Sequence, residues 1–111
     1  MTIRNGKDMD AKTIARMMRI WYLSKMKIGD SKSRFYCGIT NDPQTRMSTH
    51  EREDHDGREI EKVVVYECDS VNIAIEVETK MSQQGFDIGN PRHEGNGAVE
   101  DSKYVYLYRK P

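Results

Sequence analysis

The sequence predicts an α/β (α+β) domain in which helices flank a small, three-stranded, mainly antiparallel sheet. Two segments, residues 34–40 and 61–68, are rich in the β-branched and aromatic residues that favour strands. Residues 104–108 alternate tyrosine with valine and leucine, which is the period-two pattern of a closing strand. Residues 42–53 and 71–84 follow the first two segments, and residues typical of helix N-caps stand at their starts, at Asp42 and at Asp69-Ser70. Strands and helices therefore alternate along most of the chain.

The N-terminal part of the chain predicts a further helix over residues 8–28. Apolar side chains recur at helical spacing between Ile14 and Trp21, and basic side chains are scattered over the remaining surface. The favoured interpretation is an amphipathic helix that packs on the rest of the protein; the alternative is a helix that contacts a partner or nucleic acid. We expect residues 1–30 to form a helical extension packed on a core domain over residues 31–111.

Three polar side chains follow the first predicted strand at informative spacing. Asn41 or Asp42 can cap the next helix, and Pro43 suits its first position, where a missing N–H costs nothing. Arg46 and His50 are four residues apart and so share one helix face near the end of the strand that carries Tyr36. A hydroxyl, a guanidinium and an imidazole in one small region suit the binding of a phosphodiester.

These residues resemble the second half of the GIY-YIG nuclease motif. The matching residues are Tyr36-Cys37-Gly38, then Ile39-Thr40-Asn41-Asp42, then Arg46 ten residues after the tyrosine, then His50. In that family a helix bearing the catalytic arginine follows the YIG strand. The resemblance extends to Asp87 and covers about the last two-thirds of the chain. Cysteine replaces the central isoleucine, and the first motif, Gly-Ile-Tyr, is not recognisable.

The resemblance implies a metal-dependent endonuclease that cleaves phosphodiester bonds, of a small phage or mobile-element type. It implies one Mg²⁺ or Mn²⁺ ion on a helix-borne glutamate, a tyrosine as base, and an arginine that holds the phosphate. Tyr36 would be the base or would orient it, Arg46 would stabilise the phosphoryl group, and His50 would assist. The alternative is a protein with the same scaffold that binds nucleic acid, a nucleotide or a protein partner without cleaving it.

The metal-binding glutamate implied by the resemblance is Glu76 or Glu78, both in the helix predicted over residues 71–84. The buried stripe of that helix is expected to contain Ala74 and Met81, and Glu78 lies at its edge. Glu76 instead groups with polar residues on the wet face. A carboxylate at the rim of the core is better placed to reach inward, so we expect Glu78 to be the ligand.

The tyrosine of the missing first motif must come from elsewhere in the chain. The C-terminal strand could lie beside the strand at 34–40 and present Tyr104, Tyr106 or Tyr108. Tyr106 is the expected candidate because it is central in its strand. The closing Gly-Tyr-Asn of the family is resembled by Gly85-Phe86-Asp87, and Asn90 and Asn96 are other candidates for its asparagine; the glycine-rich residues 85–102 read as a long loop.

Composition limits the partners. Formal net charge is zero, which argues against strong indiscriminate DNA binding, but residues 1–46 carry ten Lys/Arg against four Asp/Glu. That excess indicates either a basic surface that faces phosphates or a basic helix docked on an acidic body. Nucleic acid is the expected partner, DNA before RNA, and a homodimer is left open. No apolar run has membrane-spanning length and no signal peptide is recognisable, so we expect a cytoplasmic protein with reduced, buried cysteines.

Overall fold

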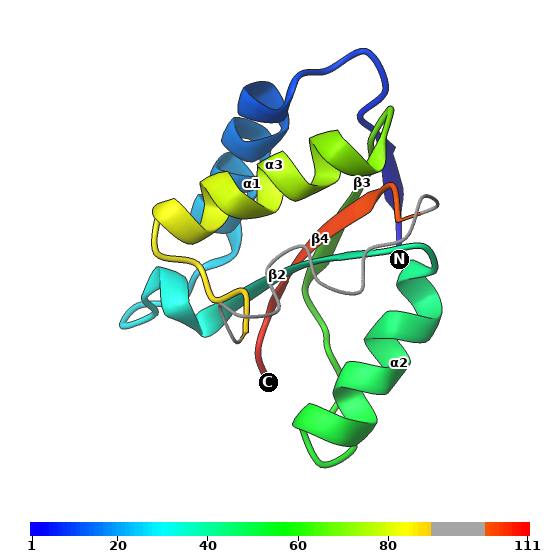
Figure 1. The fold of residues 1–111 in the computed structure, drawn as a ribbon. Coiled ribbons are helices and arrows are strands. Elements are labelled where there is room, and N and C mark those ends of the chain that lie inside the picture. Colours follow the sequence, from blue (N-terminus) through cyan, green and yellow to red (C-terminus); the bar gives the residue numbers. More distant parts are fainter. Residues whose placement is uncertain (90–101) are drawn as a thin grey trace.

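The computed structural model describes residues 1–89 and 102–111, which form three α-helices, one 3₁₀ turn and four strands. The elements are β1 (Ile3–Asn5), α1 (Ala11–Lys25), η1 (Lys32–Arg34), β2 (Phe35–Thr40), α2 (Pro43–Asp54), β3 (Val63–Glu67), α3 (Val71–Gln83) and β4 (Tyr104–Arg109). Figure 1 shows the sheet between two helical layers, with α1 and α3 on one face and α2 on the other.

The four strands form a single sheet in the order β1-β3-β4-β2. β4 pairs antiparallel with both β2 and β3, whereas β1 pairs parallel with β3. The α+β class, the mainly antiparallel pairing and the position of the terminal strand beside β2 are thus confirmed. The predicted number of three strands is wrong. β1 has only three residues, all exposed, and so short a strand leaves no alternating pattern in the sequence.

The two faces of the sheet carry different cores. The larger core lies between the sheet and the pair α1 and α3, and Ile14 and Met18 of α1 have no exposed surface in it. Helix α1 therefore packs into the main core, and the segment 1–30 also supplies β1 to the sheet. The smaller core lies on the α2 face and is rich in tyrosine. The domain boundary at residue 30 stays a prediction.

Side-chain caps set where each helix begins. Asp10, Asp42 and Ser70 each accept a hydrogen bond from the backbone N–H three residues further on, at 2.8, 3.2 and 3.3 Å. The first helix is consequently shorter than the predicted range 8–28. It begins after the Asp10 cap and ends before Met26, whose backbone is extended.

The most constrained backbone position in the sheet is Gly38 in β2. Gly38 is paired with Tyr106 of β4, and the tyrosine side chain lies over the glycine on the α2 face. A Cβ atom added at Gly38 would lie 2.4 Å from the Tyr106 hydroxyl oxygen and 2.6 Å from Cζ. Only a glycine leaves room for this ring to cross β2.

Replacing this glycine should destabilise the fold. We expect Gly38→Ala to lower the free energy of unfolding by about 1–3 kcal/mol, the usual cost of overpacking a well-packed site. Urea unfolding followed by circular dichroism measures the change. Ser48→Ala, on the exposed surface of α2, is the control and should change stability by less than about 0.5 kcal/mol. Equal stability of Gly38→Ala and wild type would show that the ring does not occupy this space.

Candidate functional site

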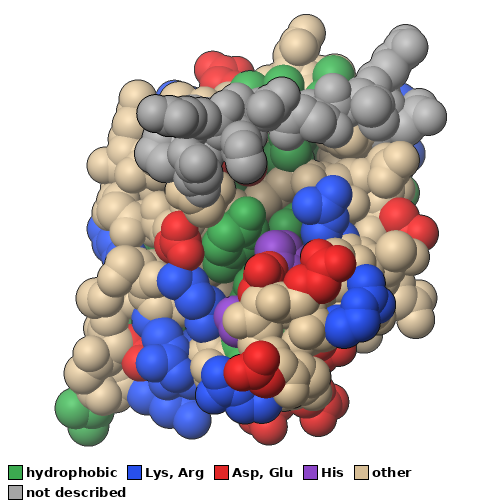
Figure 2. All heavy atoms as spheres, turned by 60° about the horizontal axis from the view of Figure 1, so that its bottom comes forward, with side chains coloured by type: hydrophobic (Ala, Val, Ile, Leu, Met, Phe, Trp, Pro, Cys, Tyr) green, Lys and Arg blue, Asp and Glu red, His purple; other side chains and the backbone are tan. Residues whose placement is uncertain are grey.

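The α2 face of the sheet carries a cluster of four rings, which we call the tyrosine–histidine cluster: Tyr36, His50, Tyr106 and Tyr108. The centroid of the Tyr36 ring lies 4.9 Å from that of His50, 5.5 Å from that of Tyr108 and 6.2 Å from that of Tyr106. Tyr36 comes from β2, His50 from α2, and the other two tyrosines from β4. Figure 2 shows this face, with histidine and hydrophobic side chains recessed between basic and acidic ones.

His50 is hydrogen-bonded at both ring nitrogens. Its Nδ1 lies 2.6 Å from Oδ2 of Asp54, and its Nε2 lies 2.7 Å from the Tyr106 hydroxyl oxygen. A carboxylate can only accept, so Nδ1–H donates to Asp54 and the Tyr106 hydroxyl donates to Nε2 of the neutral ring. Asp54 was not a sequence candidate, although its position four residues after His50 on one helix was the available signal.

Tyr106 is 1% exposed, and its hydroxyl is directed at His50 rather than at solvent. Burial raises the pKa of this hydroxyl far above its ordinary value. The structure therefore places Tyr106 where it can position His50, and a substrate could not reach the hydroxyl in this arrangement.

A second histidine repeats this arrangement at the end of α2. Nε2 of His55 lies 2.9 Å from the Tyr108 hydroxyl oxygen, and both residues are buried. Sequence reasoning found no role for His55, because its partner is 53 residues away in the chain and no local spacing connects them. The two pairs, His50 with Tyr106 and His55 with Tyr108, attach α2 and its C-cap residue to β4.

Tyr36 is the member of the cluster with partial exposure. Burial, with smaller contributions from the carboxylates of Glu78 and Asp87, raises the pKa of its hydroxyl to about 12, while Arg46 opposes this increase. The hydroxyl therefore keeps its proton at neutral pH and can donate a hydrogen bond. A Cβ added at Gly89 would lie 3.1 Å from the Tyr36 hydroxyl oxygen, so the chain passes close beside this group.

Arg46 lies one turn before His50 on α2 and is exposed, whereas His50 is 6% exposed. Its guanidinium is near enough to the cluster to lower the pKa values of Tyr36 and Tyr106, against the dominant effect of burial. The spacing of four residues therefore places the exposed guanidinium of Arg46 beside the buried rings.

Glu78 approaches from the other side of the sheet. It lies on α3 and is 5% exposed, whereas Glu76 on the same helix is exposed. Its carboxylate raises the pKa of Tyr36 and of Cys37, in both cases as the second cause after burial. The five predicted residues thus fall into two groups. Tyr36, His50 and Tyr106 are in contact, while Arg46 and Glu78 act on Tyr36 through space from α2 and α3.

Asp87 lies where the sequence resemblance predicts an anchoring residue. Its backbone bridges to Tyr36 beside β2, and its side chain accepts a hydrogen bond of 2.8 Å from the Gly89 N–H and pairs with Lys110 at 2.6 Å. An aspartate therefore anchors the start of the glycine-rich segment through its oxygens. Asn90, Asn96 and the rest of that segment up to residue 101 lie outside the described residues.

Within residues 1–89 and 102–111, no group of three or more His, Cys, Asp or Glu side chains could hold a metal ion. Cys37 and Cys68 are free and buried, as predicted. None of the described helices has both the length and the apolar character needed to cross a membrane.

Comparisons with models of known protein families, with curated proteins and with solved structures found no match.

The buried histidines should make stability depend on pH. Burial lowers the pKa of His50 and of His55 below the ordinary value of 6.5, and this outweighs the opposing effect of Asp54. The unfolded chain then binds more protons as the pH falls below 6.5, so the free energy of unfolding decreases, by at most about 1.4 kcal/mol per pH unit for each histidine. Above pH 6.5 this contribution is fully present.

Urea unfolding between pH 7.5 and 5.0 measures this dependence. The double variant His50→Gln/His55→Gln should be less stable at pH 7.5 and should lose less stability on acidification than wild type. If stability stayed constant or increased on acidification, the inference that both rings are buried in the neutral state would be wrong.

Proposed function

We propose that this protein is an endonuclease that cleaves phosphodiester bonds in nucleic acid at the edge of the sheet around Tyr36. The observation that carries the proposal is that the centroid of the Tyr36 ring lies 4.9 Å from that of His50, one helical turn from the exposed Arg46. The charges of Arg46 and Glu78 both act on the Tyr36 hydroxyl. A hydrogen-bond donor, a fixed positive charge and a carboxylate near one half-buried hydroxyl are groups that phosphoryl transfer uses. The resemblance to GIY-YIG nucleases supports the same assignment.

Tyr36 and Arg46 would bind the scissile phosphate. The protonated hydroxyl of Tyr36 would donate to one phosphoryl oxygen, and the guanidinium of Arg46 could donate to two in its planar, forked geometry. Negative charge on these oxygens increases in the transition state, so the arginine contributes most there. Because the pKa of Tyr36 is about 12, we assign this residue to phosphate binding and orientation rather than to proton abstraction.

His50 and Tyr106 would act as positioning residues. The chain of hydrogen bonds from Tyr106 through His50 to Asp54 connects β4 to α2. It therefore fixes the turn of α2 that carries Arg46 relative to the strand that carries Tyr36. Holding the two phosphate-binding groups at a constant separation lowers the entropic cost of reaching the transition state.

Glu78 is the proposed ligand of one Mg²⁺ or Mn²⁺ ion. Mg²⁺ is commonly held by one or two carboxylates, with water and substrate phosphate completing its coordination, so a single buried glutamate beside the phosphate site fits this ion. When bound, the ion would supply charge stabilisation and a nucleophilic water at neutral pH. The buried position of Glu78 and the exposure of Glu76 favour the former as the ligand.

Removal of the Arg46 guanidinium or of the Glu78 carboxylate should strongly reduce cleavage without unfolding the protein. We expect Arg46→Ala to slow the nicking of supercoiled plasmid by at least about a hundredfold, the cost of losing one preorganised donor to a developing charge. Glu78→Gln should eliminate cleavage supported by Mg²⁺ or Mn²⁺, and EDTA should eliminate that of wild type.

Two matched variants test whether these effects are local. Arg52→Ala removes an exposed arginine from the same helix, and Glu76→Gln removes an exposed glutamate from α3. Both should cut at the wild-type rate. Wild-type rates for Arg46→Ala and Glu78→Gln would show that the assigned site is wrong.

We propose DNA as the preferred substrate, and single- and double-stranded DNA and RNA assayed in parallel test that preference.

The second candidate function is binding of nucleic acid without cleavage. The specific observation in its favour is that neither Tyr36 nor His50 is ready to accept a proton. Tyr36 keeps its own proton, and both ring nitrogens of His50 are engaged by Asp54 and Tyr106. Under this alternative, wild type should bind oligonucleotides in EDTA but cut none of them with Mg²⁺ or Mn²⁺. Arg46→Ala should then weaken binding, as measured by fluorescence anisotropy.

The two buried cysteines bear on the cellular compartment in which the protein acts. Cys37 and Cys68 are free, buried thiols, and burial raises the pKa of the Cys37 thiol well above its ordinary value. An unreactive, reduced cysteine suits the reducing cytoplasm. We therefore propose a cytoplasmic protein.

A further inference from the structure

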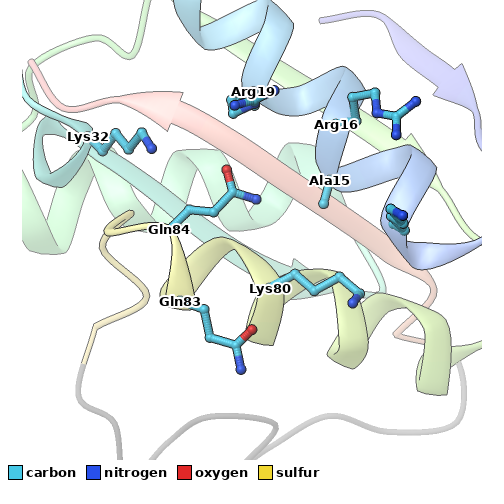
Figure 3. A pocket seen from close by; sticks show the side chains of 8 residues that line it. Ala15, Arg16, Arg19, Lys32, Lys80, Gln83 and Gln84 are labelled. Carbon is cyan, nitrogen blue, oxygen red and sulfur yellow. The ribbon is translucent and has the colours of Figure 1, made fainter.

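A second polar site lies on the other face of the sheet, in a cleft of about 460 Å³ between α1, η1 and α3. We call it the basic cleft; its lining residues are Lys12, Ala15, Arg16, Arg19, Lys32, Lys80, Gln83 and Gln84. Figure 3 shows the α1 side chains on one side of the cleft and the α3 side chains on the other, with Lys32 at the end towards η1. None of these residues belongs to the tyrosine–histidine cluster.

The cleft is strongly electropositive in a chain with no net charge. Five of its eight lining residues are lysine or arginine and none is acidic, whereas the whole chain has 18 residues of each sign. None of the five cations forms an ion pair with a residue in the described part of the chain. Charges of one sign gathered in a concave surface reinforce each other's potential. The arrangement therefore favours an anionic ligand.

The cations follow a line that matches an extended polyanion. Lys12, Arg16 and Arg19 are four and three residues apart, so they share one face of α1. They span about 10 Å along the helix at 1.5 Å per residue. This length corresponds to roughly three base-pair steps along the axis of a duplex at 3.4 Å each.

The second side of the cleft supplies two more cations and two amides. Lys80 projects from α3 across from the arginines, and Lys32 is half-buried with its Nζ 5.8 Å from the centroid of the Phe86 ring. The side-chain amide oxygen of Gln84 is buried and has no hydrogen-bond partner among the described residues. Amides and guanidinium groups together suit the oxygens of a sugar–phosphate chain better than they suit an apolar ligand.

We propose that the basic cleft binds the sugar–phosphate backbone of a nucleic acid strand. Its lining contains no aromatic side chain on which a base could stack, so recognition would rest on phosphates and would be independent of sequence. The site is distinct from the proposed cleavage site, because its lining includes none of Tyr36, Arg46 and Glu78. The proposal therefore does not require that the protein cut its ligand.

Binding in EDTA tests the proposal separately from cleavage. The probes are fluorescent 20-nucleotide single-stranded and duplex DNA, titrated with protein over a range of salt concentrations. For single-stranded DNA, the triple variant Lys12→Ala/Arg16→Ala/Arg19→Ala should bind at least roughly tenfold more weakly at 0.1 M salt, and the slope of log K against log salt should fall by about two. The arm with the larger loss identifies the strand form that the cleft takes.

Two further variants separate the cleft from overall charge and from folding. Lys25→Ala/Lys27→Ala/Lys103→Ala removes three exposed lysines that lie outside the cleft, and should lose less than roughly threefold. Lys32→Ala/Lys80→Ala leaves α1 intact and should weaken binding in the same direction as the α1 variant. Circular dichroism melts confirm that each variant is folded.

Four results would overturn the proposal. Wild type could fail to bind either probe, the cleft variants could bind as tightly as wild type, or the control triple variant could lose as much affinity as the α1 variant. Equal affinity for a polyglutamate peptide of matched charge would also overturn it, because the cleft would then select negative charge and not a phosphate chain.

Discussion

The close contact between Gly38 and Tyr106 is the constraint on which the α2 face of this protein depends. Because the glycine has no side chain, the tyrosine ring crosses β2 and its hydroxyl comes within 2.7 Å of His50 on α2. The imidazole is in turn fixed by Asp54. The absence of a side chain at Gly38 thus allows the sheet to hold α2 through His50. This contact matters because α2 has few buried residues, namely Pro43, Met47 and His50.

The polar residues of the α2 face differ in burial and in the contacts that they make. Tyr106 and Tyr108 of β4 are buried and hydrogen-bond to histidines, while Tyr36 of β2 keeps partial exposure. Their hydroxyls all have raised pKa values, chiefly because burial disfavours the phenolate. A cluster of neutral hydroxyls is a set of hydrogen-bond donors. Any charge needed for chemistry must then come from Arg46, from nearby carboxylates or from a bound ion.

The sequence was sufficient for much of the fold because its signals are local. Caps at Asp10, Asp42 and Ser70 and the alternation in β4 each lie within a few residues, and the predicted elements formed with shifts of at most three residues at their ends. β1 was not predicted because its three residues are all exposed and show no alternating pattern. It is a strand because it pairs with β3.

The candidate site was partly predictable for the same reason. Arg46 and His50 on one helix face followed from a spacing of four, and the burial of Glu78 followed from the apolar stripe of α3. The pairing of Tyr106 with His50 and that of Tyr108 with His55 join residues more than fifty positions apart. No local pattern encodes such contacts, because they depend on how α2 is placed over the finished sheet.

The pairing at the two borders of the sheet has a consequence for how this protein behaves at high concentration. Asp87 lies on the outer side of β2, where its backbone exchanges hydrogen bonds with Cys37 and Phe35 at 2.7 and 3.0 Å. The opposite border is β1, which is only three residues long and carries Arg4. Within the described residues, β1 is short and the Phe35–Cys37 part of β2 is already paired with Asp87, which disfavours intermolecular strand addition at these positions.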